Sequence, residues 1–365
     1  MVAYLGNSGH SHLQVPRIGV LVTNLGTPAA PTASAVRSYL REFLSDTRVI
    51  EMPRLIWWLI LHGVILRVRP SRSAAAYQKI WTEDGSPLLV TSQRQVAKLK
   101  ERLADKLPAG VEVILGMRYG KPSIGEALER LRQTGVRRLL VLPLYPQYAA
   151  STTGSTFDAV ADVLKSWRWL PDLHFVNHYH AAPGYIGTLA QSIREAWQER
   201  EPAERLLFSF HGLPQRYLDA GDPYHCECQR TARMVAEALE LPENRWHVSF
   251  QSRVGREEWL RPYTDETLIE WGKSGLKSVE VICPGFSADC LETLEEIAMQ
   301  NRDFFLGHGG ETFHYIHALN DRDDHMDFLA DLVMEELGTW TKAEPESEAD
   351  AQARRDRAVS QGALR

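Results

Sequence analysis

A histidine stands at the end of an apolar run in the stretch ERLLFSFHGLP, residues 204–214. Residues 206–210 are typical of a buried strand, and Gly212 and Pro214 end that strand directly after His211. Ligands of open α/β sheets bind at the carboxyl ends of the strands. A histidine at that edge can transfer protons or ligate a metal. The structural alternative is a core histidine that only caps the strand end by hydrogen bonding.

Carboxylates follow a later apolar strand in the stretch CPGFSADCLETLEEI, residues 283–297. Asp289, Glu292 and Glu296 are spaced i, i+3 and i+7, which predicts three carboxylates along one stripe of a helix. Asp289 could instead be the N-cap of that helix, where acidic residues suit the dipole. A carboxylate row that starts at a cleft edge beside the apolar Phe286 also suits delivery of a hard cation or removal of protons.

The elements that must position these groups form a repeated pattern. Short β-rich runs alternate with helical patterns, which predicts parallel sheets covered by helices. The stretch 126–143 aligns with 266–283 and pairs Gly135 with Gly275. We therefore expect two α/β units with a cleft between the carboxyl ends of their strands. The predicted strands are 18–26, 111–119, 137–146 and 172–180 in the first half and 205–212, 245–254, 278–285 and 312–320 in the second.

An apolar segment is inserted into the first half only. It contains RLIWWLILHGVILRVRP, residues 54–70, whose apolar core of 12 residues is too short for a bilayer span of about 20 residues. One interpretation is a buried helix. The favoured one is an apolar lip at about 51–70, beside several arginines, that lies on a membrane or a greasy ligand. The lip residues are predicted to be Trp57, Trp58, Ile60 and Leu61.

Bulk composition limits the classes of function. A chain of 365 residues suggests two domains. A net charge of −6, without a dense Lys/Arg block, argues against a nucleic-acid partner. The N-terminus lacks the features of a signal peptide, so a cytoplasmic location with free thiols is expected. The cysteines could meet in an iron–sulfur site, but their spacing does not favour one; they are Cys226, Cys228, Cys283 and Cys290.

Several motifs taken together resemble the ferrochelatase family, whose members insert ferrous iron into a porphyrin. They are VLVTNLGTP, MRYGKPSI, LYPQYAASTTGS, LLFSFHGLP, GDPYHCECQRTA and CPGFSADCLETLEEI. The resemblance runs from about residue 18 to 340 and implies two Rossmann-like halves, each a four-stranded parallel sheet flanked by helices. We expect an N-terminal half at 17–175, a C-terminal half at 176–320 and a helix at 321–342 that packs back on the first half. The polar tail at 343–365 is expected to be disordered.

The resemblance also implies roles for individual residues. His211 matches the family's histidine, as proton acceptor or iron ligand, and Glu292 matches its glutamate partner. Asp289 and Glu296 match an acidic path for protons or metal. The residues that match the porphyrin pocket are Leu25, Arg118, Tyr119, Tyr148, Ser151 and Phe286. Lys79, Arg118 or Ser92 could meet the propionates. Cys290 stands where some members have a second histidine, whose role is not carried over.

The expected function is insertion of Fe²⁺ into protoporphyrin IX, the last step of haem biosynthesis, with release of two protons. Alternatives are action on coproporphyrin or another tetrapyrrole and, from a different class, a haem or porphyrin carrier without turnover. Porphyrin and Fe²⁺ are the expected partners, with the membrane surface contacted through the lip. No cofactor is expected, because Fe²⁺ is a substrate and the cysteine-bearing C-terminal extension of animal enzymes is lacking. Monomer and homodimer both stay open.

Overall fold

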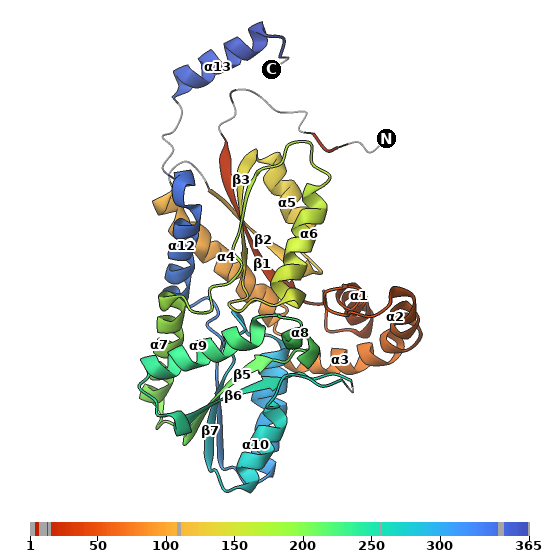
Figure 1. Cartoon of the computed structure of the whole chain (residues 1–365), viewed down its shortest axis with the longest axis vertical. Helices are drawn as coiled ribbons and strands as arrows, with labels where there is room; N and C mark the ends of the chain where they lie inside the picture. The colour runs from red at the N-terminus through yellow and green to blue at the C-terminus, as the bar shows by residue number, and fades with distance from the viewer. Residues whose placement is uncertain are drawn as a thin grey trace.

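Two parallel four-stranded sheets form the frame of the molecule, described here from a computed structural model (Figure 1). The structure describes residues 4–6, 13, 16–107, 111–255, 257–341 and 347–363. The strand orders β2-β1-β3-β4 and β6-β5-β7-β8 are the same arrangement used twice. This confirms the predicted fold class. The strands are β1 (Arg17–Gly26), β2 (Val111–Tyr119), β3 (Val136–Pro143), β4 (Asp172–Phe175), β5 (Arg205–His211), β6 (Trp246–Gln251), β7 (Ser278–Ile282) and β8 (Thr312–Ile316).

Helices cover both faces of each sheet, which explains why the central strands are continuous apolar runs. Before β5 the helical elements are α1 (Ala33–Phe43), α2 (Arg54–Ile60), η1 (Leu61–Ile65), α3 (Leu66–Ile80), α4 (Pro87–Lys106), α5 (Ile124–Gln133), η2 (Ala150–Gly154), α6 (Ser155–Leu164) and α7 (Pro183–Glu199). After β5 they are α8 (Gln215–Asp219), α9 (Tyr224–Ala238), η3 (Glu243–Arg245), α10 (Thr264–Lys273), η4 (Glu292–Asn301), α11 (Arg302–Gly307), α12 (Asp323–Leu337), η5 (Gly338–Thr341) and α13 (Glu348–Ser360).

The internal repeat is visible in the backbone. Gly135 and Gly275, which the sequence alignment pairs, follow α5 and α10 with φ of 82° and 91°. Glycine adopts this left-handed conformation without a Cβ penalty, which is why it commonly ends helices. At Gly26 (φ 104°) a Cβ would lie 1.7 Å from the carbonyl oxygen of Tyr119, so the end of β1 also requires glycine.

The helix that follows each sheet crosses to the other half. After β4, α7 packs on α9 and β8, and Trp197 Nε1 donates to Glu280 of β7 at 2.7 Å. After β8, α12 packs on α4 and β3, where Arg102 and Asp327 form an ion pair at 2.5 Å. Exchange of these helices joins the two halves and holds the carboxyl ends of their strands in place.

The C-terminal tail differs from the expectation of disorder. Residues 348–360 form α13, whose N-cap Ser347 accepts a hydrogen bond from the backbone N–H of Asp350. A side-chain cap and charged residues that favour helix explain how a segment without an apolar stripe can be helical. The prediction is therefore wrong for 348–360, while residues 342–346, 364 and 365 lie outside the described residues.

Candidate active site

His211 is the last residue of β5 and is only partly buried. Its ring Nδ1 lies 2.7 Å from the carbonyl oxygen of Gly212. A carbonyl can only accept, so Nδ1 carries the proton and the lone pair of Nε2 stays available for a proton or a metal. The next residue, Gly212, has no room for a side chain, because a Cβ there would lie 2.9 Å from the carbonyl oxygen of Gln251. This glycine lets β5 and β6 approach each other.

Gln251 connects His211 to the carboxylate helix. It ends β6 and is the register neighbour of His211. Its Oε1 accepts from the hydroxyl of Ser209 at 2.7 Å, and its Nε2 donates to the main-chain carbonyl oxygen of Glu292 at 2.8 Å. The side chain is almost fully buried, so these bonds are shielded from water. Gln251 therefore fixes the start of η4 against the end of β5.

The predicted α-helical stripe of three carboxylates is wrong. Glu292 and Glu296 lie on η4, a π-helix, whereas Asp289 precedes the helix in a buried turn. A π-helix bonds i to i+5, so the α-helical spacing on which the stripe was based does not apply. The N-cap alternative is wrong as well, because the Asp289 carboxylate accepts from Thr293 Oγ1 and from residues 315–320 rather than from a backbone N–H of the first helical turn.

Asp289 is held in a closed set of hydrogen bonds. Its carboxylate accepts from Tyr315 Oη at 2.7 Å, from His317 Nδ1 at 2.8 Å and from Asn320 Nδ2 at 2.9 Å. Thr293 Oγ1 donates to it at 3.0 Å. Burial raises the pKa of Asp289, but hydrogen bonds from His317, Asn320 and Tyr315 outweigh burial and bring the pKa below its usual range. Asp289 is thus a buried anion that ties the turn before η4 to the end of β8.

Glu296 is a buried carboxyl group of η4 with altered acidity. Burial and the neighbouring charges of Glu292 and Glu295 raise its pKa to about 7, against hydrogen bonds from Ser252 that lower it. The backbone N–H of Ser252 donates to Glu296 at 2.7 Å, and the Ser252 hydroxyl donates to the other oxygen. A carboxyl group with this pKa can both accept and release a proton near neutral pH.

The inserted helices of the first half form a wall against η4. α3 contacts η4, and Lys79 Nζ pairs with the buried carboxylate of Glu295 at 2.7 Å. Tyr39 and Tyr77 lie close enough to Glu292 that its charge, after burial, raises their pKa values. Both tyrosines therefore stay protonated beside Glu292.

Five of the six predicted pocket residues retain exposed surface; they are Leu25, Arg118, Tyr148, Ser151 and Phe286. Leu25 and Phe286, from different halves, pack in one cluster with Leu88, Ala288 and Cys290. Tyr148 donates its backbone N–H to Glu227 at 2.7 Å, and Ser151 lies on η2. Leu25, Phe286, Tyr148 and Ser151 are all partly buried.

Arg118 and Tyr119 belong to a polar network that sequence reasoning missed. The Arg118 guanidinium donates to Asp46 and to Ser155 Oγ at 2.7 Å, and Tyr119 Oη donates to Asp46 at 2.7 Å. Tyr119 has no exposed surface, so its assignment as a pocket wall is corrected. Ser92 is also fully buried and cannot meet a propionate. No sequence spacing could reveal Asp46, because its partners lie over 70 residues away.

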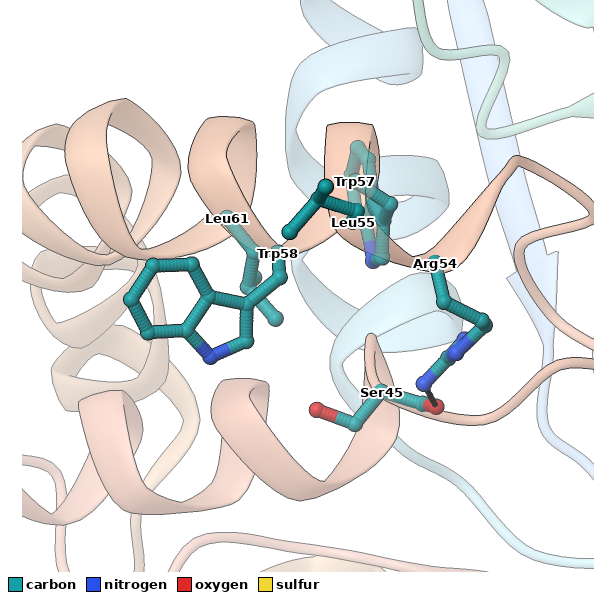
Figure 2. A pocket seen from close by; sticks show the side chains of 6 residues that line it. All are labelled: Ser45, Arg54, Leu55, Trp57, Trp58 and Leu61. Atoms are coloured by element: carbon teal, nitrogen blue, oxygen red, sulfur yellow. Dashed lines mark hydrogen bonds between the residues drawn. The ribbon is translucent and has the colours of Figure 1, made fainter.

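The residues predicted for the apolar lip differ in how far they are exposed. Trp58 is 56% exposed and Leu55 is 75% exposed, whereas Trp57 is 9% exposed and donates its Nε1–H to the carbonyl oxygen of Leu44 at 2.6 Å. Figure 2 shows the Trp58 indole beside a pocket of about 340 Å³ that Arg54 also lines. Trp57 and Leu61 are core residues, which corrects their assignment to the lip, and Ile60 is partly buried. The exposed apolar patch consists of Leu55, Ile56, Trp58, Leu59, Val64 and Val68.

Figure 1 shows α2 and α3 projecting to one side of the sheets. Across the part of the chain that the structure describes, no helix combines the length and the hydropathy needed to cross a membrane.

Each of the π-helical segments found in the described ranges carries a predicted site residue. Leu61 lies on η1, Ser151 on η2, and Glu292 with Glu296 on η4. π-Helical turns occur frequently at functional sites. The four cysteines form no disulfide, and burial raises the pKa values of Cys228, Cys283 and Cys290. The absence of a cluster stays a prediction.

Comparison with known proteins decides the family. The model of the family described as Ferrochelatase matches residues 17–337. The chain belongs to the ferrochelatase family. A ferrochelatase of Nitrosococcus oceani is 58% identical over 93% of this chain and 92% of its own length. One of Thioalkalivibrio sulfidiphilus is 55% identical over 98% of each chain.

A solved structure shares the fold at low sequence identity. It is described as SirB from Bacillus subtilis with Fe³⁺, and it has a TM-score of 0.52 and 11% identity, covering 91% of this chain and 100% of that chain. This likeness supports the two-sheet architecture alone.

Proposed function

We propose that the chain is a metal chelatase that inserts Fe²⁺ into protoporphyrin IX to give protohaem. Membership of the ferrochelatase family supports the reaction class. The observation that supports the site assignment is the bridge made by Gln251, which is the register neighbour of His211 and donates a hydrogen bond to the main chain of Glu292.

His211 and Glu292 divide the chemistry of the reaction. The free-base porphyrin has two pyrrole N–H protons that leave as Fe²⁺ binds the four nitrogens, so no electron is transferred. His211 accepts protons through Nε2, which points away from its hydrogen bond with Gly212. Glu292 holds the incoming iron or accepts the proton from His211. Bending of the macrocycle exposes its nitrogen lone pairs and favours the transition state.

Glu296 continues the proton path from Glu292. Its pKa of about 7 matches the pH at which protons must be passed on to solvent. Asp289 takes a different role from the predicted relay. Because five donors already occupy its carboxylate, it positions the turn before η4; the donors are Thr293, Tyr315, His317, Ala318 and Asn320.

The exposed patch at Trp58 and Leu55 delivers the greasy substrate or receives the product at a membrane surface. The patch lies on α2, η1 and α3, and α3 contacts η4, so a porphyrin held at the patch would enter beside the helix that carries Glu292. We propose a cytoplasmic enzyme that associates peripherally with the membrane, has no nucleic-acid partner and requires no cofactor for metal insertion.

An anaerobic insertion assay tests the function. Purified protein receives Fe²⁺ with protoporphyrin IX or with coproporphyrin III, beside His211→Ala, Glu292→Gln and the control His308→Ala, which removes a partly buried histidine at the C-terminal end of α11. Metalloporphyrin formation from protoporphyrin that both site variants abolish and the control retains is expected. Turnover of coproporphyrin alone would reassign the substrate. Binding without turnover in the unmodified chain would favour the carrier alternative.

A further inference from the structure

A cluster of potential metal ligands lies outside the His211–Glu292 pair. His178 and His180 follow β4, in a stretch that was expected to continue the strand to residue 180, although β4 ends at Phe175. Glu227 lies in the first turn of α9. One ligand atom from each of the three residues falls within 4.8 Å of the others. His178 Nδ1 is 2.6 Å from Glu227 Oε1, and His180 Nδ1 is 3.2 Å from Glu227 Oε2.

The geometry of His180 is not that of a satisfied ion pair. Its Nδ1 is buried and lies 3.2 Å from Glu227 Oε2 without the geometry of a hydrogen bond. The side chains of His180 and Glu227 are each 8% exposed. A buried polar atom without a partner costs about 1–3 kcal/mol. A cation placed among the three ligand atoms would give that nitrogen a partner and neutralise the buried carboxylate.

The donor set indicates which ions fit. Two imidazoles and one carboxylate can bind zinc, and a water molecule can supply the fourth ligand where the site is exposed to solvent. His178 provides that opening, because its side chain is 47% exposed. For such nitrogen and oxygen ligands, affinity rises from Fe²⁺ to Co²⁺, and a four-coordinate set of two histidines, a carboxylate and solvent is typical of zinc.

We propose that His178, His180 and Glu227 bind one divalent transition-metal ion, with Zn²⁺ preferred over Fe²⁺ and Co²⁺. The bound ion stabilises the segment that carries Tyr148. Glu227 Oε2 also accepts the backbone N–H of Tyr148 at 2.7 Å, so a metal on Glu227 links α9, the segment after β4 and this loop. Gln147 and Thr231 add a second link at 2.9 Å between the loop and α9.

Metal titration of the full chain tests the proposal. The double variant His211→Ala/Glu292→Ala serves as the background, so that the proposed iron-insertion site contributes no metal binding. Co²⁺ is added as a spectroscopic probe, and Zn²⁺ is then used as competitor. We expect one Co²⁺ per chain, visible d–d bands and displacement of Co²⁺ by Zn²⁺. His178→Ala should weaken binding by at least about tenfold, because loss of groups that only support a ligand already costs 10–100-fold.

A matched control separates this site from an ordinary His–Glu pair. His174 Nε2 lies 3.0 Å from Glu336, and the His174 side chain is 43% exposed. Among the described residues, no third potential metal ligand groups with His174 and Glu336. His174→Ala should leave Co²⁺ binding unchanged. Zn²⁺ should also raise the melting temperature of the background protein but not that of its His178→Ala form. No bound Co²⁺, or equal binding with and without His178 in folded protein, would overturn the proposal.

Discussion

Gln251 Nε2 donates a hydrogen bond to the main-chain carbonyl oxygen of Glu292, across 2.8 Å. Gln251 is also the parallel-sheet neighbour of His211. Gln251, which does not act as an acid or a base, therefore helps to set the positions of His211 and Glu292, the two residues to which we assign the reaction. Glu292 is the first residue of the π-helix η4, so this hydrogen bond also fixes where η4 begins relative to β6.

Replacing Gln251 should impair turnover more than porphyrin binding. Gln251→Glu keeps an acceptor for Ser209 but removes the donor to Glu292, and we expect kcat to fall by about 10–100-fold, as for other residues that orient a site. The KM for porphyrin should change little. Steady-state kinetics with both substrates measure this, and circular dichroism confirms folding. Unchanged kcat in a folded Gln251→Glu protein would contradict the positioning role.

Glu296→Gln should stabilise the protein at high pH. The folded-state pKa of Glu296 is about 7, above its ordinary value of 4.5, so its stabilising contribution is present below pH 4.5 and is lost as pH rises through 7. Glutamine stays neutral and should gain up to about 3 kcal/mol above pH 7. Urea unfolding at pH 5 and pH 8 measures the difference.

The same Glu296→Gln change should lower kcat near neutral pH if protons leave through this group. The pH profile of kcat should then lose an ionisation near 7. Equal profiles for the variant and the unmodified chain would remove Glu296 from the proton path, while the stability result would stand on its own.

Neighbouring tryptophans of the lip should respond differently to the same change. Trp58→Ser, combined with Leu55→Ser, removes exposed apolar surface and should weaken association with anionic liposomes by about tenfold or more, with little effect on stability. Trp57→Ser should instead destabilise the fold by about 3–5 kcal/mol, because that ring is buried. Liposome sedimentation and thermal melts separate the effects. Equal sedimentation of the Trp58 variant and the unmodified chain would exclude the patch as a membrane contact.

His317→Ala should destabilise the protein more at pH 6 than at pH 9. The hydrogen bond to Asp289 raises the pKa of His317 above 6.5, so the stabilisation is full below pH 6.5 and is lost as pH rises through the folded-state value. Chemical unfolding at the two pH values measures this, with His308→Ala, which removes a partly buried histidine, as the control. A destabilisation independent of pH would mean that only the packing of His317 matters.

Local patterns in the sequence were sufficient for the fold. Alternation of apolar strands with amphipathic helices predicted all eight strands, and the repeat around Gly135 and Gly275 predicted two matching halves. These features depend on neighbours within a few residues of each other, since strand and helix periodicities are local. The placement of His211 at a strand end follows from the same patterns.

Tertiary structure alone decided the partners of the site residues. Gln251 and Glu292 are 41 residues apart, Asp289 and His317 are 28 apart, and Arg118 and Asp46 are 72 apart. Burial of Trp57 next to an exposed Trp58 likewise depended on contacts with α1 and the loop after it. The π-helical winding of η4 overrode the expected α-helical stripe. Hydrogen bonds and charges between residues distant in sequence set these outcomes, and no local periodicity records such contacts.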